Sequence, residues 1–411
     1  MNFIYNLIVQ ITWFHLKIVA LFHPKIKLFV QGRNQTFSIL KNKIRKEHKV
    51  IWVHVASLGE FEQGLPVIEK LKTTYPTYKI LVSFFSPSGY EVKKNTDVAD
   101  AVVYLPLDTR KNAKHFIETV NPVLAIFVKY ELWPNYLKEL KEKQVPILLI
   151  SAIFRKEQVF FKWYGGFMRK ALHTFTHFFV QDNNSVALLK SINLNNATLS
   201  GDTRFDRVAE ILDRNNKLTF MELFKGNETC LVAGSTWPED EEIIVKFINE
   251  TQKHPKIVFA PHNIKTEHIQ SLKNSISKKV VLYTEIEQDD VSSCEVLIIN
   301  TVGLLTKIYS YADIAYVGGA FATGLHNTLE PAVFGIPIII GPEYKGFNEA
   351  EKLVAENGIL VVRGFDEFTT TLGNLLDNPE YLKNTGVINA NYVKENKGAS
   401  VQIMVHIRTL I

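Results

Sequence analysis

Short apolar runs recur along most of this chain, and most are followed by a small or polar residue and then by a segment with helical spacing. Such runs are typical of strands that are buried on both faces of a parallel sheet. Strands that alternate with helices predict an α/β protein with doubly wound sheets. The expected strands are 50–55, 80–84, 101–104, 124–128, 146–150, 178–181, 229–233, 256–259, 280–283, 296–299, 314–317 and 338–340.

The clearest unit of this pattern opens with strand 314–317, which ends in Gly318 and Gly319. Glycine lets a backbone approach a ligand closely, and a helix expected over 328–334 would offer its positive end to a phosphate. Glu330, in its first turn, could accept hydrogen bonds from ribose hydroxyls. This strand, loop and helix together predict a ligand site at the carboxyl end of strand 314–317. A glycine turn needed only for its geometry would account for the same residues.

Hydroxyl groups and a histidine follow other strands of the second half. A turn with Ser235 and Thr236 comes after strand 229–233 and can cradle a phosphate before an acidic helix. His262 follows strand 256–259, where a lone histidine is more often structural than functional. Neither GxGxxG nor GxxxxGK[ST] occurs, so neither a dinucleotide fingerprint nor a P-loop is predicted.

Carboxylates follow two strands of the first half. Strand 50–55 leads into Ser57 and an amphipathic helix with Glu60 in its first turn. A glutamate there usually compensates the helix dipole, but it could act as a general base if burial offset the dipole. Glu131 follows strand 124–128, where the alternatives are a cap or a surface ion pair.

The amino-terminal 22 residues are almost entirely apolar, with only His15 and Lys17 ionisable. No small-residue cleavage site follows, which argues against a removed signal peptide. The segment could span a bilayer or lie in its surface, with a polar stripe outward. The following basic residues favour membrane attachment, with most of the protein on the cytoplasmic side. The stripe is Asn2, Asn6, Gln10 and Lys17, and the basic residues are Lys25, Lys27, Arg33, Lys41, Lys43, Arg45, Lys46 and Lys49.

Aromatic and basic side chains are interleaved over residues 154–170. This composition fits a core helix with a basic outer face, a nucleic-acid surface, or a surface that meets a bilayer and a phosphorylated lipid. The apolar amino terminus favours the last of these. Arg155 at the start of the segment is a candidate phosphate ligand.

The length of 411 residues suggests two or three domains, and 46% hydrophobic with 22% charged residues indicates a folded globular protein. Cys230 and Cys294 lie far apart without metal-ligand spacing, so a reducing compartment is expected, with no disulfide, metal or cofactor. The net charge of +5 is mild, and the absence of a nucleic-acid-binding motif argues against a nucleic-acid partner.

Three motifs taken together resemble the bacterial 3-deoxy-D-manno-octulosonic acid (Kdo) transferases. They are SLGE at 57–60, ELWP at 131–134 and GLHNTLEP at 324–331. The resemblance extends over nearly all of the chain after residue 50. It implies a GT-B architecture, with two doubly wound Rossmann-like domains facing a cleft. The implied reaction is inverting Kdo transfer from CMP-Kdo to a lipid A precursor in lipopolysaccharide biosynthesis, at the cytoplasmic face of the inner membrane.

The resemblance also implies roles for single residues. Glu60 falls on the general base and Glu131 on a carboxylate that organises the acceptor side. Two departures are Lys129, where an acidic residue is common, and a missing arginine between Pro261 and His262. The implied acceptor or phosphate ligands are Ser57, Arg155 and Arg204, and the implied nucleotide-sugar ligands are Ser235, Thr236, His262, Gly318, Gly319, Asn327, Glu330 and Asn348.

The expected domains are a membrane-anchoring helix (1–30), an acceptor-binding domain (31–206), a linker (207–227) and a nucleotide-sugar-binding domain (228–411). Two alternatives to Kdo transfer remain open, because a fold does not determine its chemistry. One is another GT-B nucleotide-sugar enzyme, such as a UDP-sugar transferase or an epimerase. The other is a membrane protein that binds a nucleotide sugar without turning it over.

Overall fold

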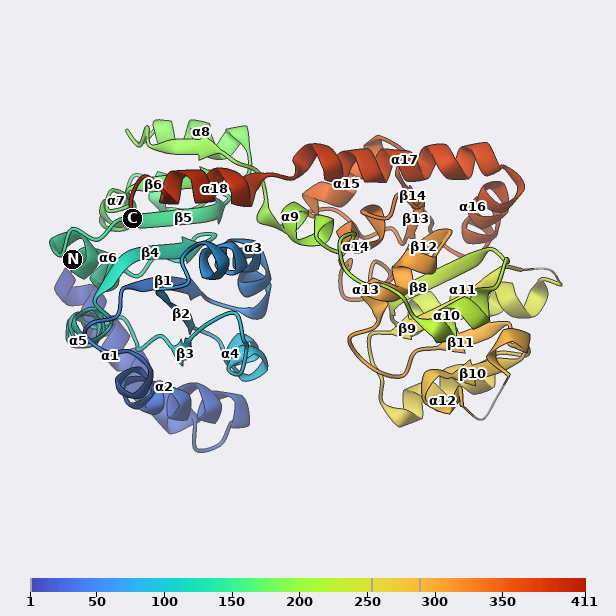
Figure 1. Ribbon diagram of the computed structural model, residues 1–411, viewed down its shortest axis with the longest axis horizontal. Coiled ribbons are helices and arrows are strands. Elements are labelled where there is room, and N and C mark those ends of the chain that lie inside the picture. Colours follow the sequence, from blue (N-terminus) through green and yellow to red (C-terminus); the bar gives the residue numbers. More distant parts are fainter. Residues whose placement is uncertain (1, 253, 288–289) are drawn as a thin grey trace. The chain divides into compact units, whose positions relative to one another are not determined.

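A computed structural model of the protein describes residues 2–252, 254–287 and 290–411. The chain folds into two compact units (Figure 1). Unit 1 extends to Arg207 and includes Lys397–Ile411, and unit 2 is Val208–Asn396. Each unit contains a seven-stranded parallel sheet, which confirms the expected α/β class with two Rossmann-like domains.

The sheet of unit 1 has the order β3-β2-β1-β4-β5-β6-β7. The chain runs outward from β1 to β3 and then returns to place β4 on the other side of β1. This switch point is where open parallel sheets bind ligands, beyond the carboxyl ends of the strands. The strands are β1 (Val50–Val55), β2 (Lys79–Phe84), β3 (Ala101–Tyr104), β4 (Pro122–Val128), β5 (Ile147–Ala152), β6 (His177–Val180) and β7 (Ala197–Leu199).

Helices cover both faces of this sheet, because its strands carry apolar side chains on both sides. One core lies under α2, α5, α6, α7 and α8, and the other lies under α3, α4 and α18. The helices are α1 (Asn2–Val19), α2 (Pro24–Lys43), α3 (Leu58–Thr74), α4 (Pro87–Lys93), α5 (Arg110–Val120), α6 (Pro134–Glu142), α7 (Gly166–Leu172), α8 (Asn183–Lys190), α9 (Thr203–Ala209) and α18 (Ala399–Ile407), with a 3₁₀ turn η1 (Val159–Phe161).

Unit 2 repeats this plan with the order β10-β11-β9-β8-β12-β13-β14 and a switch point between β8 and β12. One core lies under α11, α12 and α16. The strands are β8 (Cys230–Thr236), β9 (Lys256–Pro261), β10 (Val280–Leu282), β11 (Val296–Ile298), β12 (Ile314–Val317), β13 (Ile338–Ile340) and β14 (Ile359–Val361). The helices are α10 (Thr219–Lys225), α11 (Pro238–Glu250), α12 (Thr266–Ser275), α13 (Leu305–Ile308), α14 (Leu329–Ala332), α15 (Asn348–Ala355), α16 (Phe365–Asp377) and α17 (Pro379–Asn396), with 3₁₀ turns η2 (Tyr283–Glu285), η3 (Val291–Ser293) and η4 (Tyr309–Tyr311).

The amino-terminal segment is a helix, α1, packed beside α2 in unit 1. Its side chains Trp13 and Leu16 join a small apolar cluster with Phe29. Among the described residues, no helix combines the length and the apolar character needed to cross a bilayer. The opposite face of α1 exposes large apolar side chains, namely Phe3, Ile4, Leu7, Ile8, Ile11, Phe14 and Ile18.

Two expectations about this region are wrong. Asn6 does not face outward, because its side chain bonds to Asn135 and to the amide of Arg110. Arg33 does not offer its charge to lipid: it is 5% exposed, lies 3.5 Å from the ring centre of Phe29, and donates to two backbone carbonyls. The side chain of Asn2 lies outside the described residues.

The unit boundaries differ from those expected. The presumed linker packs on unit 2, where Leu218 N–H donates to the hydroxyl of Tyr311 at 2.7 Å and Lys225 pairs with Asp313 at 2.8 Å. The carboxyl-terminal helix α18 belongs to unit 1 and packs against α3 (Figure 1). Asp206 fixes its start by accepting from the amides of Gly398 at 3.0 Å and Ser400 at 3.2 Å.

Asp206→Ala should therefore loosen α18. Loss of a helix cap costs about 1–2 kcal/mol, which corresponds to a fall in Tm of about 2–4 °C per kcal/mol in a unit of this size. Thermal unfolding followed by circular dichroism measures the change, with the exposed Asp97→Ala as a matched control. Equal Tm values for both variants and the unmodified protein would contradict this account of the cap.

Candidate functional site

Glu60 occupies the first turn of α3, directly beyond the carboxyl end of β1. Ser57 caps the helix, and its hydroxyl accepts from the amide of Glu60 at 3.5 Å. The Glu60 carboxylate turns back to accept from the amide of Ala56, so the two residues satisfy donors of the same helix start. The glutamate is only 7% exposed.

Burial raises the pKa of Glu60 to about 7, and the negative charge of Glu131 adds to the increase. Hydrogen bonds from the backbone amides of Ala56 and Ser57, together with the positive charge of Lys129, lower this pKa. Burial therefore outweighs the helix-terminal donors. A carboxylate with this pKa can accept a proton near neutral pH and release it again.

Glu131 lies in the loop after β4, beside a buried histidine of β1. Trp133 Nε1 donates to His54 Nε2 at 2.9 Å, and His54 Nδ1 lies 2.8 Å from Ser83 Oγ. Because an indole nitrogen can only donate, the proton of the imidazole is on Nδ1 and the ring is neutral. Glu131 lies 3.8 Å from His54 Nε2, but the two do not form a salt bridge because the imidazole is neutral. His54 therefore does not compensate the charge of Glu131.

The two candidate phosphate-binding arginines of unit 1 differ in how close they lie to Glu60. Arg204 pairs with Asp202 at 2.8 Å, and Asp202 also accepts from Gln63 of α3 at 3.3 Å, so Arg204 is held next to the helix that carries Glu60. Arg155 is exposed in the loop after β5, two strands from β1 in the sheet order.

Asp240 organises the corresponding edge of unit 2. It is fully buried and accepts from the amides of Trp237 and Gly319, each at 2.9 Å, and from the hydroxyl of Tyr316 at 2.7 Å. These bonds tie the turn after β8 to the loop after β12. A Cβ on Gly318 would lie 2.5 Å from the carbonyl oxygen of Ser235, so this close approach requires glycine.

Most polar groups of these two turns are already paired within the protein. The Gly318 amide donates to Gly234, the Gly319 amide to Asp240, and the Thr236 hydroxyl to Glu241 at 2.8 Å. They shape the loops, and in this arrangement the two glycine amides are not free to hold a phosphate. Ser235 was expected in a turn but lies in β8, at the register shift between Gly234 and Thr236, with φ +55°. It is partly exposed and is the candidate here that reaches the surface.

An aromatic stack borders the same edge. His262 stacks on Trp237 at 4.8 Å between ring centres and on His326 at 4.7 Å. Trp237 Nε1 donates to His326 Nε2 at 3.1 Å, and burial with the neighbouring His262 lowers the pKa of His326. His326 is therefore neutral, while His262 is exposed and could meet a ligand.

Glu330 and Asn327 lie together at the start of α14, which is shorter than the helix expected over 328–334. The Glu330 carboxylate accepts from Asn327 Nδ2 at 3.1 Å and from Thr306 Oγ1 at 2.8 Å. Each of its oxygens retains a lone pair that could accept a ribose hydroxyl. Asn348 is exposed at the first position of α15.

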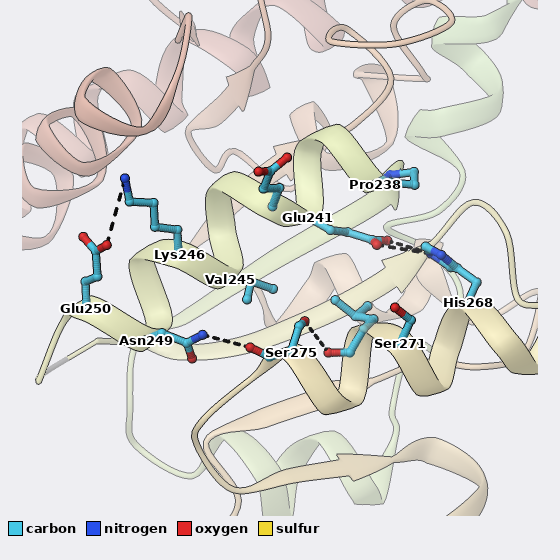
Figure 2. A pocket seen from close by; sticks show the side chains of 11 residues that line it. Pro238, Glu241, Val245, Lys246, Asn249, Glu250, His268, Ser271 and Ser275 are labelled. Atoms are coloured by element: carbon cyan, nitrogen blue, oxygen red, sulfur yellow. Dashed lines mark hydrogen bonds and ion pairs between the residues drawn. The ribbon is translucent and has the colours of Figure 1, made fainter.

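A groove of about 500 Å³ lies between α11 and α12 (Figure 2). Glu241 and His268 face each other across it at 3.1 Å, and Glu241 also holds Thr236. None of the residues expected to bind ligand lines this groove. Within the described chain, no three histidine, cysteine or acidic residues are grouped to hold a metal ion.

No organising role was predicted from the sequence for the residues that organise both edges: His54, Trp133, Trp237 and Asp240. A histidine inside an otherwise apolar strand was the available signal for His54, because buried polar side chains need partners. Asp240 gave no such signal, since an acidic residue in the first turn of a helix is ordinary.

Residues 31–207 match the family described as 3-deoxy-D-manno-octulosonic-acid transferase, and the match ends where unit 1 passes into unit 2. The chain is 27% identical to the 3-deoxy-D-manno-octulosonic acid transferase of Rickettsia bellii, over 86% of this chain and 87% of that protein. It is 29% identical to the enzyme of the same name from Aquifex aeolicus, over 84% and 93%.

A solved structure shares the fold. The UDP-GlcNAc 2-epimerase of Neisseria meningitidis superposes with a TM-score of 0.62 at 16% identity, covering 88% of this chain and 100% of that one. This likeness extends across both units and concerns the fold alone, in agreement with the expected GT-B class.

Glu131→Gln should lower the pKa of Glu60, because it removes a negative charge that disfavours ionisation. Carbon-13 NMR titration of labelled glutamate carboxyls measures this pKa, with the Glu60 signal assigned by its loss in Glu60→Gln. We expect a pKa below about 7. An unchanged pKa would mean that burial alone sets the basicity of Glu60.

Proposed function

We propose that this chain, a member of the 3-deoxy-D-manno-octulosonic acid (Kdo) transferase family, moves Kdo from CMP-Kdo to a lipid A precursor in lipopolysaccharide biosynthesis. Two relatives of that name align with 86% and 84% of the chain. The observation that carries the proposal is Glu60, a buried carboxylate with a pKa of about 7 at the switch point of the first sheet.

In the proposed reaction, Glu60 accepts the proton of an acceptor hydroxyl as its oxygen attacks the anomeric carbon of Kdo. The bond from that carbon to the CMP phosphate oxygen breaks, CMP leaves with the bonding electrons, and the anomeric configuration inverts. Glu131 maintains the basicity of Glu60 through its charge and organises the acceptor side. Ser57 and Arg204 lie on or beside α3, where an acceptor phosphate would meet them.

The nucleotide sugar is assigned to unit 2. Glu330 and Asn327 would hold the ribose, and the exposed ring of His262 and the Ser235 hydroxyl would face the rest of the donor. The paired amides of Gly318 and Gly319 suggest that these glycines act by allowing close packing rather than by donating to phosphate.

We place the protein at the cytoplasmic face of the inner membrane, and the exposed face of α1 supports its attachment to a membrane. Its row of exposed apolar side chains would enter the interface between headgroups and acyl chains, a mode of binding that needs no spanning helix. Trp163 and Tyr164, exposed by 92% and 59% in the loop before α7, offer a second apolar contact in the same unit.

The direct test is transfer from CMP-Kdo to a tetra-acylated, phosphorylated lipid A precursor in detergent, with products weighed by mass spectrometry. Added Kdo units would support the proposal and give their number. Folded protein that forms no product from CMP-Kdo but turns over a UDP-sugar would favour another nucleotide-sugar enzyme of this fold.

Glu60→Gln should reduce kcat by about 10²–10⁴-fold, because general-base catalysis contributes an effect of that size. The amide side chain preserves shape and can still accept from Ala56, so binding of CMP-Kdo should be retained. Steady-state kinetics and calorimetry measure the two quantities, with Glu62→Gln in the same helix as the control. Activity comparable to the unmodified protein would refute the assignment of Glu60 as base.

Glu330→Ala should weaken binding of CMP by about tenfold or more, because it removes a charged acceptor of ribose hydroxyls. Isothermal titration calorimetry gives the Kd, and Glu343→Ala, at an exposed position of the same unit, serves as the control. Equal Kd values for the two variants would place the ribose elsewhere.

A further inference from the structure

The first turns of α1 are bonded into unit 1 through polar side chains. The Tyr5 hydroxyl donates to Asp108 Oδ2 at 2.7 Å, and its ring lies 5.4 Å from that of Phe167. Asn6 exchanges hydrogen bonds with Asn135 at 3.3 and 3.5 Å and accepts from the amide of Arg110 at 3.2 Å. A helix that served only to attach the protein to a bilayer would not need these specific bonds.

Asp108 connects α1 to the start of α6. Besides the Tyr5 hydroxyl, its carboxylate accepts from the amides of Asn135 and Tyr136, each at 3.1 Å. These amides belong to the first turn of α6, where backbone donors lack partners within the helix. Asp108 is 1% exposed, so water has little access to replace a lost partner.

The start of α6 also fixes the loop that carries Glu131. Pro134 begins the helix directly after Trp133, whose indole is bonded to His54 at 2.9 Å and packs on Phe85 at 4.8 Å. The clasp formed by Tyr5, Asn6, Asp108 and Asn135 is therefore two residues from Trp133. A shift of α1 away from Asp108 would remove a constraint from this loop.

We propose that Tyr5 and Asn6 are positioning residues for the catalytic edge of unit 1. They act through Asp108 and the first turn of α6 to hold Trp133 and Glu131 in place beside Glu60. Helix α1 is then part of the acceptor-side site as well as the surface that faces lipid. This inference rests on the proposed function, because the roles of Glu60 and Glu131 are assigned there.

Tyr5→Phe tests the clasp by removing one hydroxyl group. With a detergent-dispersed acceptor we expect kcat to fall about tenfold, because small displacements at a reacting site are costly, while KM for CMP-Kdo stays unchanged. Tyr78→Phe, which alters a tyrosine just before β2 at the other end of the strands, is the matched control and should keep the kcat of the unmodified protein.

A double variant separates positioning from general destabilisation. If Tyr5 acts through the loop that carries Trp133, Trp133→Phe alone should remove most of the contribution of Tyr5 to kcat. Adding Tyr5→Phe to Trp133→Phe should then change kcat by less than about twofold. A full tenfold further loss would overturn the proposed route. So would an unchanged kcat in Tyr5→Phe alone.

A readout independent of turnover is the indole N–H of Trp133 in nitrogen-15 NMR. Tyr5→Phe should shift this signal and speed its hydrogen exchange, while Tyr78→Phe should leave both unchanged. An unaltered Trp133 signal in Tyr5→Phe would overturn the clasp whether or not the protein transfers Kdo. Absence of transfer by the unmodified protein, with the expected NMR change, would instead count against the proposed function alone.

Discussion

The parallel pairing of β1 with β4 is the constraint on which the chemistry of unit 1 depends. Its register sets Val53 beside Ile126 and His54 beside Phe127, so the chain leaves both strands at one edge of the sheet. Glu60 and Glu131 lie just after these two strands, beyond that edge. Burial makes the repulsion between their charges stronger than it would be in water. The backbone thus brings together two carboxylates that sequence separates, and the resulting pKa of Glu60 suits a base.

Unit 2 uses the same topology for a different purpose. There Asp240 connects the turn after β8 to the loop after β12. Its carboxylate accepts from the amides of Trp237 and Gly319, so neither amide is available to a phosphate. What remains available is a set of side chains at the rim, including Glu330 and the exposed ring of His262. The carboxyl edge of the sheet therefore carries a buried base in unit 1 and exposed ligand-binding side chains in unit 2. This difference fits our proposal that unit 1 binds the acceptor substrate and unit 2 binds the donor nucleotide sugar.

Much of the fold could be predicted because buried parallel strands leave continuous apolar runs in a sequence. Strands β7 and β14 were missed because each has only three residues, of which at most one is fully buried, so neither leaves a continuous buried apolar run. Arg33 was misplaced because aromatic rings and carbonyls can bury a guanidinium, which charge patterning does not reveal. The return of α18 to unit 1 is a tertiary event with no local signal. At the site, the first-turn position of Glu60 was readable, whereas its burial and the His54–Trp133 bond required the packed structure.

The decisive measurement is the pH dependence of kcat/KM for Kdo transfer by the unmodified protein. Because the base must be ionised to act, the rate should rise with pH through the pKa of Glu60 in the free enzyme, with an acid limb near 7. An acid limb near about 4.3, the ordinary value for glutamate, would contradict the claim that burial at the β1–β4 switch point creates the base.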